Sequence, residues 1–478
     1  MERDNLVHRI LWVITVVIAA CCWNASAHAG EPRKPNIIFI LADDLGYGEL
    51  GCYGQKKIRT PNLDKMAAQG LRFTQHYAGN AVCAPSRCVL MTGKHSGHAY
   101  IRNNTETKPD GQQPIPADTV TIARLLRSIG YVTGLIGKWG LGMHDSTGDP
   151  QKQGFDHFFG YYCQRHAHNH YPKFLWRNAE KVPLEGNPGG ATGKQHSHDL
   201  FEKEMVGFIR KNKDQPFFLY LPFIIPHVAL QVPEDSLAEY KGKWDDPPYK
   251  GGKGYQPHPH PRAAYAAMIT HMDRTIGRMF DLLKELGLDD NTIVLFSSDN
   301  GPTHDGVGGS DSIFFRSAGL LRGFKGSLLE GGVRVPMIVR WPKHIPPGRT
   351  TDHISAFQDV MPTLCEIAGA KTPGDIDGMS FLPTLLGKGQ QKQHEFLYWE
   401  FSGYGGQQAV RLGDWKAIRQ NMHKGNTQIQ LFNLAKDISE TTDVAAQHPD
   451  VVDRVLRIMR EQHTPSKLYP FKALDGGK

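Results

Sequence analysis

The chain has 478 residues, of which 40% are hydrophobic and 22% charged, a composition that excludes wholesale disorder and a small disulfide-built scaffold. Its formal net charge is +7, but the lysines and arginines are scattered along the chain, so we expect no nucleic-acid partner. Seven cysteines are an odd number, which rules out complete internal disulfide pairing.

The first 29 residues are predicted to be a secretory signal peptide. The start is basic, with Arg3 and Arg9, an apolar run follows at 10–22, and small residues at 27–29 suit cleavage after them. The apolar run is shorter than the roughly 20 residues that span a bilayer, so we expect a secreted or periplasmic protein with no transmembrane span when mature. The four residues that end at Cys21 resemble a bacterial lipobox, so a lipid anchor there is an alternative hypothesis.

Four short apolar runs rich in branched residues are predicted to be strands buried on both faces of a parallel sheet. They cover residues 36–41, 131–136, 217–225 and 292–296. Helical patterns at 119–129 and 263–286 alternate with them, which predicts an α/β fold with helices packed on a mostly parallel sheet. Polar side chains follow each strand, at Asp43 and Asp44, Lys138, His227, and Asp299 with Asn300. Ligands of such sheets bind at the carboxyl ends of the strands, so these groups should meet there.

Four of these polar residues indicate a metal site. Asp43, Asp44, Asp299 and Asn300 offer only oxygen donors, which suit Ca²⁺ or Mg²⁺ better than Zn²⁺. Each residue taken alone is more typical of a helix cap or a turn than of a metal site, but their joint recurrence favours the metal site. A cation there could hold and polarise an anionic substrate.

The segment 83–93 carries the most informative motif. It reads Cys-Ala-Pro-Ser-Arg-Cys-Val-Leu-Met-Thr-Gly and is similar to the signature of the type I sulfatases, the formylglycine-dependent, arylsulfatase-like family of the alkaline phosphatase superfamily. Further segments similar to that family follow in the expected order at 36–48, 137–139, 226–227, 298–301, 322–326 and 330–336. The resemblance therefore covers roughly residues 35–450. It implies an alkaline-phosphatase-like fold with a mixed, mostly parallel sheet between helices.

The carboxyl-terminal part of the chain differs in composition, because long buried runs give way to short mixed ones after about residue 375. Segments 414–418 and 431–434 resemble strands of the family's small antiparallel sheet, and 450–462 resembles its final helix. We therefore expect a signal peptide at 1–29, a catalytic sulfatase domain at 30–375 and a carboxyl-terminal sub-domain at 376–478. No Gly/Ser or Pro linker separates the last two, so they should pack together.

The resemblance implies that a maturation enzyme, formylglycine-generating or equivalent, oxidises Cys83 to formylglycine (3-oxoalanine). The hydrated aldehyde carries two hydroxyls on one carbon. One attacks the sulfur of a sulfate monoester and forms a covalent sulfo-enzyme intermediate. The second then loses its proton and re-forms the aldehyde, which eliminates inorganic sulfate. A plain serine could be sulfated but would lack this exit.

The resemblance also implies roles for the neighbouring residues. Asp43, Asp44, Asp299 and Asn300 would bind one Ca²⁺ ion together with the modified Cys83. The remaining catalytic roles belong to cations and one acid: Arg87 would hold the diol, Lys138 and Lys325 would grip the sulfate oxygens, and His227 would protonate the leaving alcohol. Asp299 is in addition a candidate to accept the proton of the attacking hydroxyl.

One position departs from the family pattern. The family usually has Gly-Lys-Trp-His-Leu-Gly, whereas this chain has Gly140 in place of the histidine that contacts the diol. Either a nearby residue such as His144 substitutes for that imidazole, or the enzyme is slower or inactive. The turnover of a Gly140→His variant distinguishes two explanations. A higher turnover would show that the missing imidazole matters, and a lower one that the pocket is built for glycine.

The substrate class is expected to be a sulfated small molecule or, more specifically, a sulfated carbohydrate, which the basic charge favours. Two alternatives are a phosphate mono- or diesterase of the same superfamily and a non-catalytic glycan-binding homologue, for which Gly140 is the supporting feature. His166 and His168 lie in a segment that similar sulfatases place near the substrate. Histidines alternate in this segment, and they alternate again at 196 and 198 and at 258 and 260. Such alternating histidines could bind a metal ion, or they could be polar loop residues.

Overall fold

The computed structural model describes residues 33–252 and 254–476. The expected signal peptide and the alternative lipid site at Cys21 lie outside the described residues. The chain divides into two units, residues 1–34 and 35–478, and the second contains the sheets, the helices and the site. None of the helices in the described ranges is both long and apolar enough to cross a membrane.

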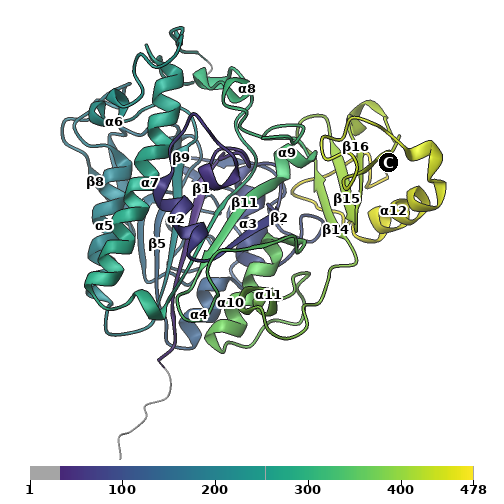
Figure 1. Cartoon of the computed structure of the whole chain (residues 1–478), viewed down its shortest axis with the longest axis horizontal. Coiled ribbons are helices and arrows are strands. Elements are labelled where there is room, and N and C mark those ends of the chain that lie inside the picture. Colours follow the sequence, from purple (N-terminus) through teal and green to yellow (C-terminus); the bar gives the residue numbers. More distant parts are fainter. Residues whose placement is uncertain (1–32, 253, 477–478) are drawn as a thin grey trace, which may run out of the picture. The chain divides into compact units, whose positions relative to one another are not determined.

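A large mixed sheet forms the centre of this unit (Figure 1). Its strand order is β12-β2-β11-β10-β1-β9-β5-β6-β7-β8, with β13 paired to β2. The strands are β1 (Asn36–Asp43), β2 (Leu71–Tyr77), β5 (Val132–Lys138), β6 (His157–Tyr161), β7 (Phe174–Arg177), β8 (Glu180–Pro183), β9 (Phe217–Pro226), β10 (Thr292–Ser298), β11 (Arg334–Arg340), β12 (Arg349–Thr351) and β13 (Ser355–Ala356). The central strands β10, β1, β9, β5 and β6 run parallel, which confirms the mostly parallel sheet expected from the sequence.

The apolar run of β1 explains its central place, because all eight of its residues are buried. Side chains of a strand alternate between the two faces of a sheet. Ile38 and Ile40 accordingly join one core cluster, whereas Ile37 and Phe39 join another on the opposite face. A strand without a polar face can only lie inside a sheet that is covered on both sides.

Helices cover both faces of the sheet. The first core cluster contains residues of α2 (Pro61–Ala68), α5 (Ser197–Lys211) and α7 (Pro261–Glu285). The second contains residues of α3 (Cys83–Thr92), α4 (Ile122–Ser128), α10 (Val360–Ala368) and α11 (Leu382–Leu386). Figure 1 shows α7, α5 and α2 on one side of the strands and α4, α10 and α11 on the other. The helices predicted at 119–129 and 263–286 correspond to α4 and α7.

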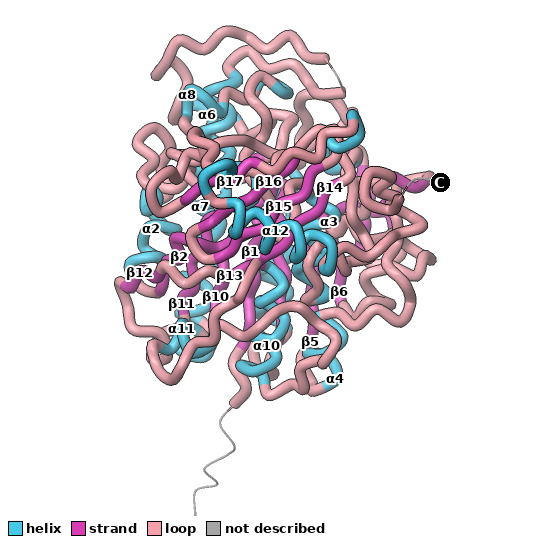
Figure 2. The backbone as a smooth tube through the Cα atoms, turned by 90° about the vertical axis from the view of Figure 1, so that its right-hand side faces the viewer, coloured by secondary structure: helices cyan, strands magenta, loops and turns pink. Residues whose placement is uncertain are grey.

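A second, antiparallel sheet has the order β14-β15-β16-β17 and lies near the carboxyl end (Figures 1 and 2). It consists of β14 (Leu397–Phe401), β15 (Gln407–Leu412), β16 (Trp415–Arg419) and β17 (Gln430–Asn433). The final helix α12 (Pro449–Glu461) packs on it through Val455, Ile458 and Met459. The expected small carboxyl-terminal sheet with a helix is confirmed, while the boundary at residue 375 stays a prediction.

A buried ionic network joins this small sheet to the main body. Glu330 of α9 (Glu330–Val333) accepts a hydrogen bond from Lys416 of β16 at 2.8 Å, and both side chains are fully buried. Tyr77 of β2 donates to the other carboxylate oxygen at 2.7 Å. Burial would raise the pKa of Glu330, but attraction from Lys416, Arg334 and Arg411 lowers it to about 2. The carboxylate therefore holds three elements together as an anion.

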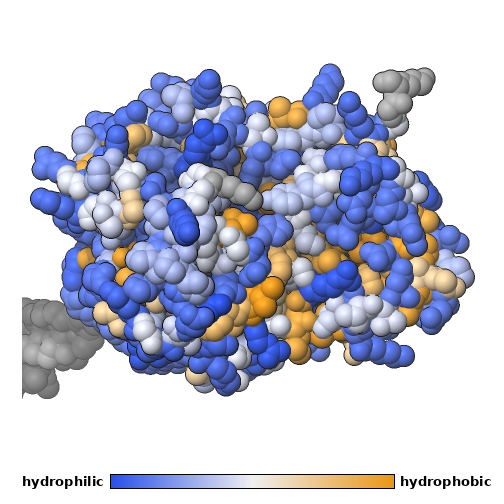
Figure 3. Space-filling view, turned by 90° about the horizontal axis from the view of Figure 1, so that it is seen from above, coloured by the Kyte–Doolittle hydropathy of each residue, from blue (hydrophilic) through white to orange (hydrophobic). Residues whose placement is uncertain are grey.

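The remaining elements are short. They are β3 (Glu106–Thr107) paired with β4 (Gly111–Gln112), α6 (Glu234–Ala238) and α8 (Ser312–Phe315). The face seen in Figure 3 is mostly hydrophilic, with smaller apolar groups between the polar ones. The stretch 241–261, rich in Pro, Gly and Lys, contains exposed residues, but the ring of Tyr255 within it lies against His168.

Candidate active site

Two consecutive aspartates end strand β1 at the edge where the parallel strands finish. Consecutive residues of an extended strand point to opposite faces. Asp44 breaks that alternation with a left-handed φ of 65°, a conformation that aspartate adopts more readily than most residues. Both carboxylates are fully buried and lie beside the thiol of Cys83 or the groups that contact it. The turn at Asp44 thus gives the site two adjacent carboxylates from one strand.

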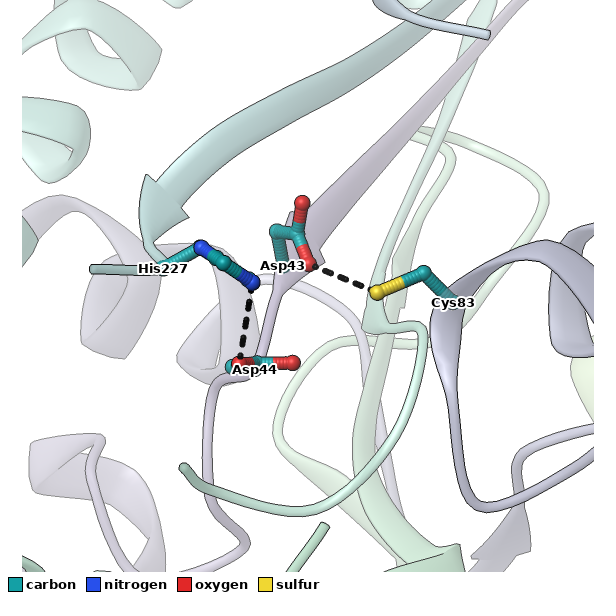
Figure 4. A group of neighbouring side chains, drawn as sticks. All are labelled: Asp43, Asp44, Cys83 and His227. Atoms are coloured by element: carbon teal, nitrogen blue, oxygen red, sulfur yellow. Dashed lines mark hydrogen bonds and ion pairs between the residues drawn. The ribbon is translucent and has the colours of Figure 1, made fainter. Parts of the chain in front are cut away.

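Cys83 is the first residue of helix α3, and its side chain is only 1% exposed. Its Sγ lies 3.4 Å from Asp43 Oδ1 and 3.6 Å from Lys325 Nζ. Figure 4 shows Cys83 and His227 on opposite sides of the two aspartates. Burial and repulsion by Asp43 raise the pKa of the Cys83 thiol above its ordinary value. An unmodified thiol in this position is therefore held in its protonated, weakly nucleophilic form.

Arg87 lies one helical turn after Cys83 and so occupies the same face of α3. Its Nε and Nη2 donate to Asp299 Oδ2 at 3.1 and 2.8 Å, and Nη1 donates to the carbonyl oxygen of Lys138. Nη2 also lies 3.4 Å from Asp43 Oδ2. The guanidinium is fully buried and fixes the ends of β1, β5 and β10 around the helix terminus.

Two lysines face the carboxylates. Lys138, the last residue of β5, forms an ion pair with Asp43, and both side chains are buried. Lys325 donates to Asp44 Oδ2 at 2.8 Å. Burial alone would lower the pKa of Lys325, but attraction by Asp44 and Cys83 raises it well above its usual value. Lys325 therefore stays positively charged, and both ammonium groups are placed to bind an anion.

His227 follows β9 and lies on the side of the aspartates away from Cys83 (Figure 4). Its Nδ1 is hydrogen-bonded to the carbonyl oxygen of Val228, which can only accept, so Nδ1 carries a hydrogen. Nε2 therefore faces the site, 3.7 Å from Asp44 Oδ2. Burial and repulsion by Lys325 lower the pKa of His227 to about 4, so the free site holds a neutral imidazole.

Asp299 and Asn300 follow β10 and complete the ring of oxygen atoms. Burial and repulsion by Asp43 raise the pKa of Asp299 to about 6 despite its contact with Arg87. Asn300 Nδ2 donates to Asp44 Oδ1 at 2.8 Å, whereas its buried Oδ1 has no hydrogen-bond partner among the described residues. Ligand atoms of Asp43, Asp44, Cys83 and His227 lie within 4.8 Å of one another. Clustered carboxylates and an unpaired amide oxygen fit a hard divalent cation.

The surroundings of Gly140 show what occupies the position where the family usually has a histidine. Gly140 has a left-handed φ of 83°, and a Cβ built on it would lie 2.6 Å from Nε2 of Gln164. The Gln164 carboxamide is buried, and neither of its polar atoms has a hydrogen-bond partner in the described part of the chain. His144, considered as a substitute, instead lies 3.2 Å from Asp145 and 3.3 Å from Asp149 and is partly exposed.

The two histidines expected near the substrate lie in different surroundings. The ring of His168 stacks on His227 with centroids 4.9 Å apart, and the ring of Tyr255 lies 5.2 Å from that of His168. His166 instead packs against Tyr161 and Phe174 and lines a separate pocket of about 610 Å³. The structure thus brings His168, but not His166, into contact with the site.

The structure adds residues that sequence reasoning missed. Thr303 donates to Asp44 Oδ2 at 2.8 Å, three positions after Asn300, so its nearness in sequence was an available signal. Gln164 lies inside the histidine-containing segment and could have been noticed for the same reason. Tyr255 comes from the loop after Lys241, and no feature of that loop's composition indicated a contact with the site.

Comparisons with known proteins agree with this geometry. The sulfatase family model matches residues 35–370, and the model of the N-sulphoglucosamine sulphohydrolase carboxyl-terminal region matches residues 324–464. The chain is 33% identical over 462 residues to the steryl-sulfatase of Mus musculus, covering 81% of this chain and 70% of that protein. It is 31% identical over 428 residues to the N-acetylgalactosamine-6-sulfatase of Canis lupus familiaris, covering 85% of this chain and 75% of that protein.

A solved structure is similar over nearly the whole chain. The crystal structure of Ps i-CgsB in complex with k-i-k-neocarrahexaose superposes with a TM-score of 0.76 at 31% identity, covering 90% of this chain and 92% of that one. Family models, sequence relatives and this fold agree with the motif at residues 83–93. The chain belongs to the sulfatase family and is a sulfuric ester hydrolase.

Proposed function

We propose that this sulfatase removes sulfate from a sulfated carbohydrate, with formylglycine formed from Cys83 as the nucleophile and one Ca²⁺ ion beside it. The observation that carries the proposal is the position of Cys83. It lies at the buried start of α3, within 3.4 Å of Asp43 and 3.6 Å of Lys325. A nucleophile at this point has carboxylates on one side and cations on the other, as transfer of an anionic group requires.

The surroundings of Cys83 favour a modified residue over a free thiol. Its raised pKa leaves little thiolate near neutral pH, and the groups around it are arranged for oxygen chemistry. Formylglycine would supply a hydrated aldehyde, in which one hydroxyl attacks sulfur and the other allows sulfate to be eliminated. Arg87, on the same helical face and bonded to Asp299, is the group that would hold the diol.

Binding of the sulfate group is assigned to Lys138 and Lys325. Each already contacts a buried carboxylate, so each has lost its hydration before substrate arrives. In a site from which water is excluded, a positive charge stabilises the negative charge of the transition state more strongly than it would in water.

His227 is assigned as the acid that protonates the leaving alcohol. Its Nδ1 hydrogen bond to Val228 leaves Nε2 directed into the site. The pKa of about 4 belongs to the free site, and an anionic sulfate bound nearby favours the protonated form. Asp299, whose carboxylate lies beside Arg87 at the end of β10, is the candidate acceptor for the proton of the attacking hydroxyl.

The metal is assigned as Ca²⁺, held by Asp43, Asp44, Asp299 and Asn300 together with the modified Cys83. A divalent metal is typical of the family, and the mostly oxygen ligand set supports a hard cation. When bound, the ion would polarise the sulfate and neutralise the charge of the carboxylates. Asn300 would contribute Oδ1, because its Nδ2 is already used on Asp44.

A sulfated carbohydrate is supported by the relatives, which include an N-acetylgalactosamine-6-sulfatase and the Ps i-CgsB structure in complex with k-i-k-neocarrahexaose. The formal charge of +7 agrees with an anionic glycan. His168 and His166 are proposed to contribute to specificity, the first beside the leaving alcohol and the second at the neighbouring pocket. Export through the amino-terminal signal, to the periplasm or outside the cell, and a maturation enzyme acting on Cys83 are parts of the same proposal.

The proposal is tested by the mass of the tryptic peptide that contains Cys83, residues 73–87, from protein purified from its native source. We expect the mass of the aldehyde, and a Cys83→Ala variant without turnover. Recovery of the unmodified thiol in active protein would overturn the assignment of the nucleophile. Paired rates on an aryl sulfate and an aryl phosphate test the reaction, and a higher phosphate rate would favour the phosphatase alternative.

A further inference from the structure

A second group of potential metal ligands lies between helices α5 and α7, apart from the oxygen-rich site. It consists of His196, which precedes α5, Asp199 in the first turn of α5, and His271 in the middle of α7. One ligand atom from each lies within 4.8 Å of the other two. His271 Nε2 and Asp199 Oδ1 are already 2.7 Å apart. Two imidazoles and one carboxylate are a donor set typical of zinc.

The hydrogen bond of His196 shows which of its nitrogens is available. Its Nε2 lies 3.2 Å from the carbonyl oxygen of Gln231, which can only accept, so Nε2 carries the hydrogen. The lone pair of the neutral ring is therefore on Nδ1. That atom is buried and has no hydrogen-bond partner among the described residues, and His196 as a whole is only 3% exposed. An unpaired buried lone pair is a position that a metal ion can satisfy.

A hydrogen bond to one ring nitrogen of His271 likewise shows that its other nitrogen is directed at the cluster. Its Nδ1 lies 3.1 Å from Ser236 Oγ, and the hydroxyl of Ser236 has Asp235 Oδ1 as an acceptor at 3.3 Å. The serine oxygen can therefore accept from Nδ1–H, which leaves Nε2 directed at Asp199. Histidines that bind metals characteristically donate their other ring N–H to an oxygen, as both of these do.

We propose that His196 Nδ1, His271 Nε2 and the Asp199 carboxylate bind one zinc ion, a site that is independent of the proposed sulfatase mechanism. Bonds of about 2.0–2.2 Å in a tetrahedron place ligand atoms about 3.3 Å apart, so Asp199 has to move slightly away from His271. Its side chain is 49% exposed and can do so. The proton between His271 and Asp199 passes to solvent as the ion enters, and water completes the coordination.

A third cluster has a similar composition, but its buried histidine has no ring nitrogen free to bind a metal. His95, His98 and Asp377 also lie within 4.8 Å of one another. However, His95 Nδ1 already accepts from the backbone N–H of Gly97 at 3.1 Å, and its Nε2 contacts Gln462 Oε1 at 3.0 Å. Both ring nitrogens are therefore in use, and this cluster provides a matched control for the first.

The experiment measures zinc on the full mature protein in excess Ca²⁺, which occupies the oxygen-rich site. After treatment with a zinc chelator and dialysis, Zn²⁺ titration by calorimetry is expected to give about one ion per chain. His271→Gln and Asp199→Asn should abolish this binding, while His98→Gln should leave it unchanged. Because Asp199 is half-exposed, its variant should fold even if that of the buried His271 does not.

Two further readouts separate metal binding from a purely structural role. Ser236→Ala should weaken zinc binding by about 10- to 100-fold without abolishing it, because it removes only the outer hydrogen bond of His271. Co²⁺ in place of zinc should give the visible absorption of a tetrahedral site in wild type but not in Asp199→Asn. Equal zinc uptake by wild type and Asp199→Asn, or equal loss in His98→Gln, would overturn the proposal.

Discussion

Gly140 lies so close to Gln164 that a Cβ added at position 140 would be 2.6 Å from Gln164 Nε2, so the Gln164 carboxamide would have to shift. The backbone of Gly140 is also left-handed, with a φ of 83°. The part of the site beside Arg87 and Lys138 is therefore occupied by the backbone of Gly140 and the buried carboxamide of Gln164. Of the two explanations that the sequence left open, this geometry favours a pocket shaped for glycine over a merely missing imidazole.

We expect Gly140→Ala and Gly140→His to lower kcat/KM of an aryl sulfate by about tenfold or more, equivalent to about 1.4 kcal/mol of transition-state stabilisation. The cause is backbone strain together with displacement of Gln164. Gly130→Ala is the matched control, because Gly130 has a φ of 91° but nothing within 4 Å of an added Cβ. A Gly140→His variant faster than wild type would contradict the prediction.

Removal of divalent metal should abolish turnover, and Ca²⁺ should restore it. Asn300→Ala is expected to raise the Ca²⁺ concentration needed for half-maximal activity by at least about tenfold, since a buried oxygen ligand is lost. Calcium titration of the stripped enzyme measures this. Asn426→Ala, in an exposed loop, should leave the calcium dependence unchanged. If Asn300→Ala matched wild type, Asn300 would not be a ligand.

His227→Gln should reduce kcat by about 10²- to 10⁴-fold on an alkyl or sugar sulfate but far less on a nitrophenyl sulfate. A nitrophenolate leaves without protonation, whereas an alkoxide does not. His168→Gln is the control, because its ring stacks on His227 but has no assigned proton to transfer. Equal losses on both substrates would assign His227 a binding role instead.

Glu330→Gln should destabilise the protein by about 3–5 kcal/mol at neutral pH, because Lys416 and its neighbours would keep buried charges without their anion. The folded pKa of Glu330, about 2, lies below its ordinary value of 4.5. Its contribution is therefore fully present above pH 4.5 and is lost as the pH falls from 4.5 towards 2.

Urea unfolding of wild type and Glu330→Gln at a series of pH values measures that contribution. The difference between the two should shrink as the pH falls below 4.5. Glu395→Gln serves as the control, since its ion pair with Arg454 is exposed to solvent and should matter little. A constant difference at all pH values would show that the network does not depend on the carboxylate charge.

The fold and the centre of the site could be predicted because their signals are local. The apolar run of β1 and the polar residues after it are contiguous in sequence, and parallel strands bring such endings to one edge. Tyr255 and Gln164 could not be predicted in the same way. Tyr255 reaches His168 only through the path of a long loop, and Gln164 matters through its contact with Gly140, which no sequence spacing encodes.

The pairing of His196 with His271 as potential metal ligands could not be predicted from the sequence either. The sequence shows alternating histidines at 196 and 198, but the partner of His196 is His271, on a different helix. Which ring nitrogen is free depends on the carbonyl of Gln231 and the hydroxyl of Ser236. Histidine tautomers are set by tertiary contacts. The sequence alone therefore could not decide whether the alternating histidines bind metal or are polar loop residues.

The burial of Cys83 imposes an order of events on the life of the protein. With 1% of its surface exposed, the residue is enclosed once α3 packs against the strand ends. A modifying enzyme would have to reach this side chain, and the folded protein keeps it buried at the start of a helix. If Cys83 is converted to formylglycine as proposed, the conversion has to precede folding, and a molecule that folds first keeps the unreactive thiol. The active fraction of a preparation would then depend on the rate of maturation relative to the rate of folding.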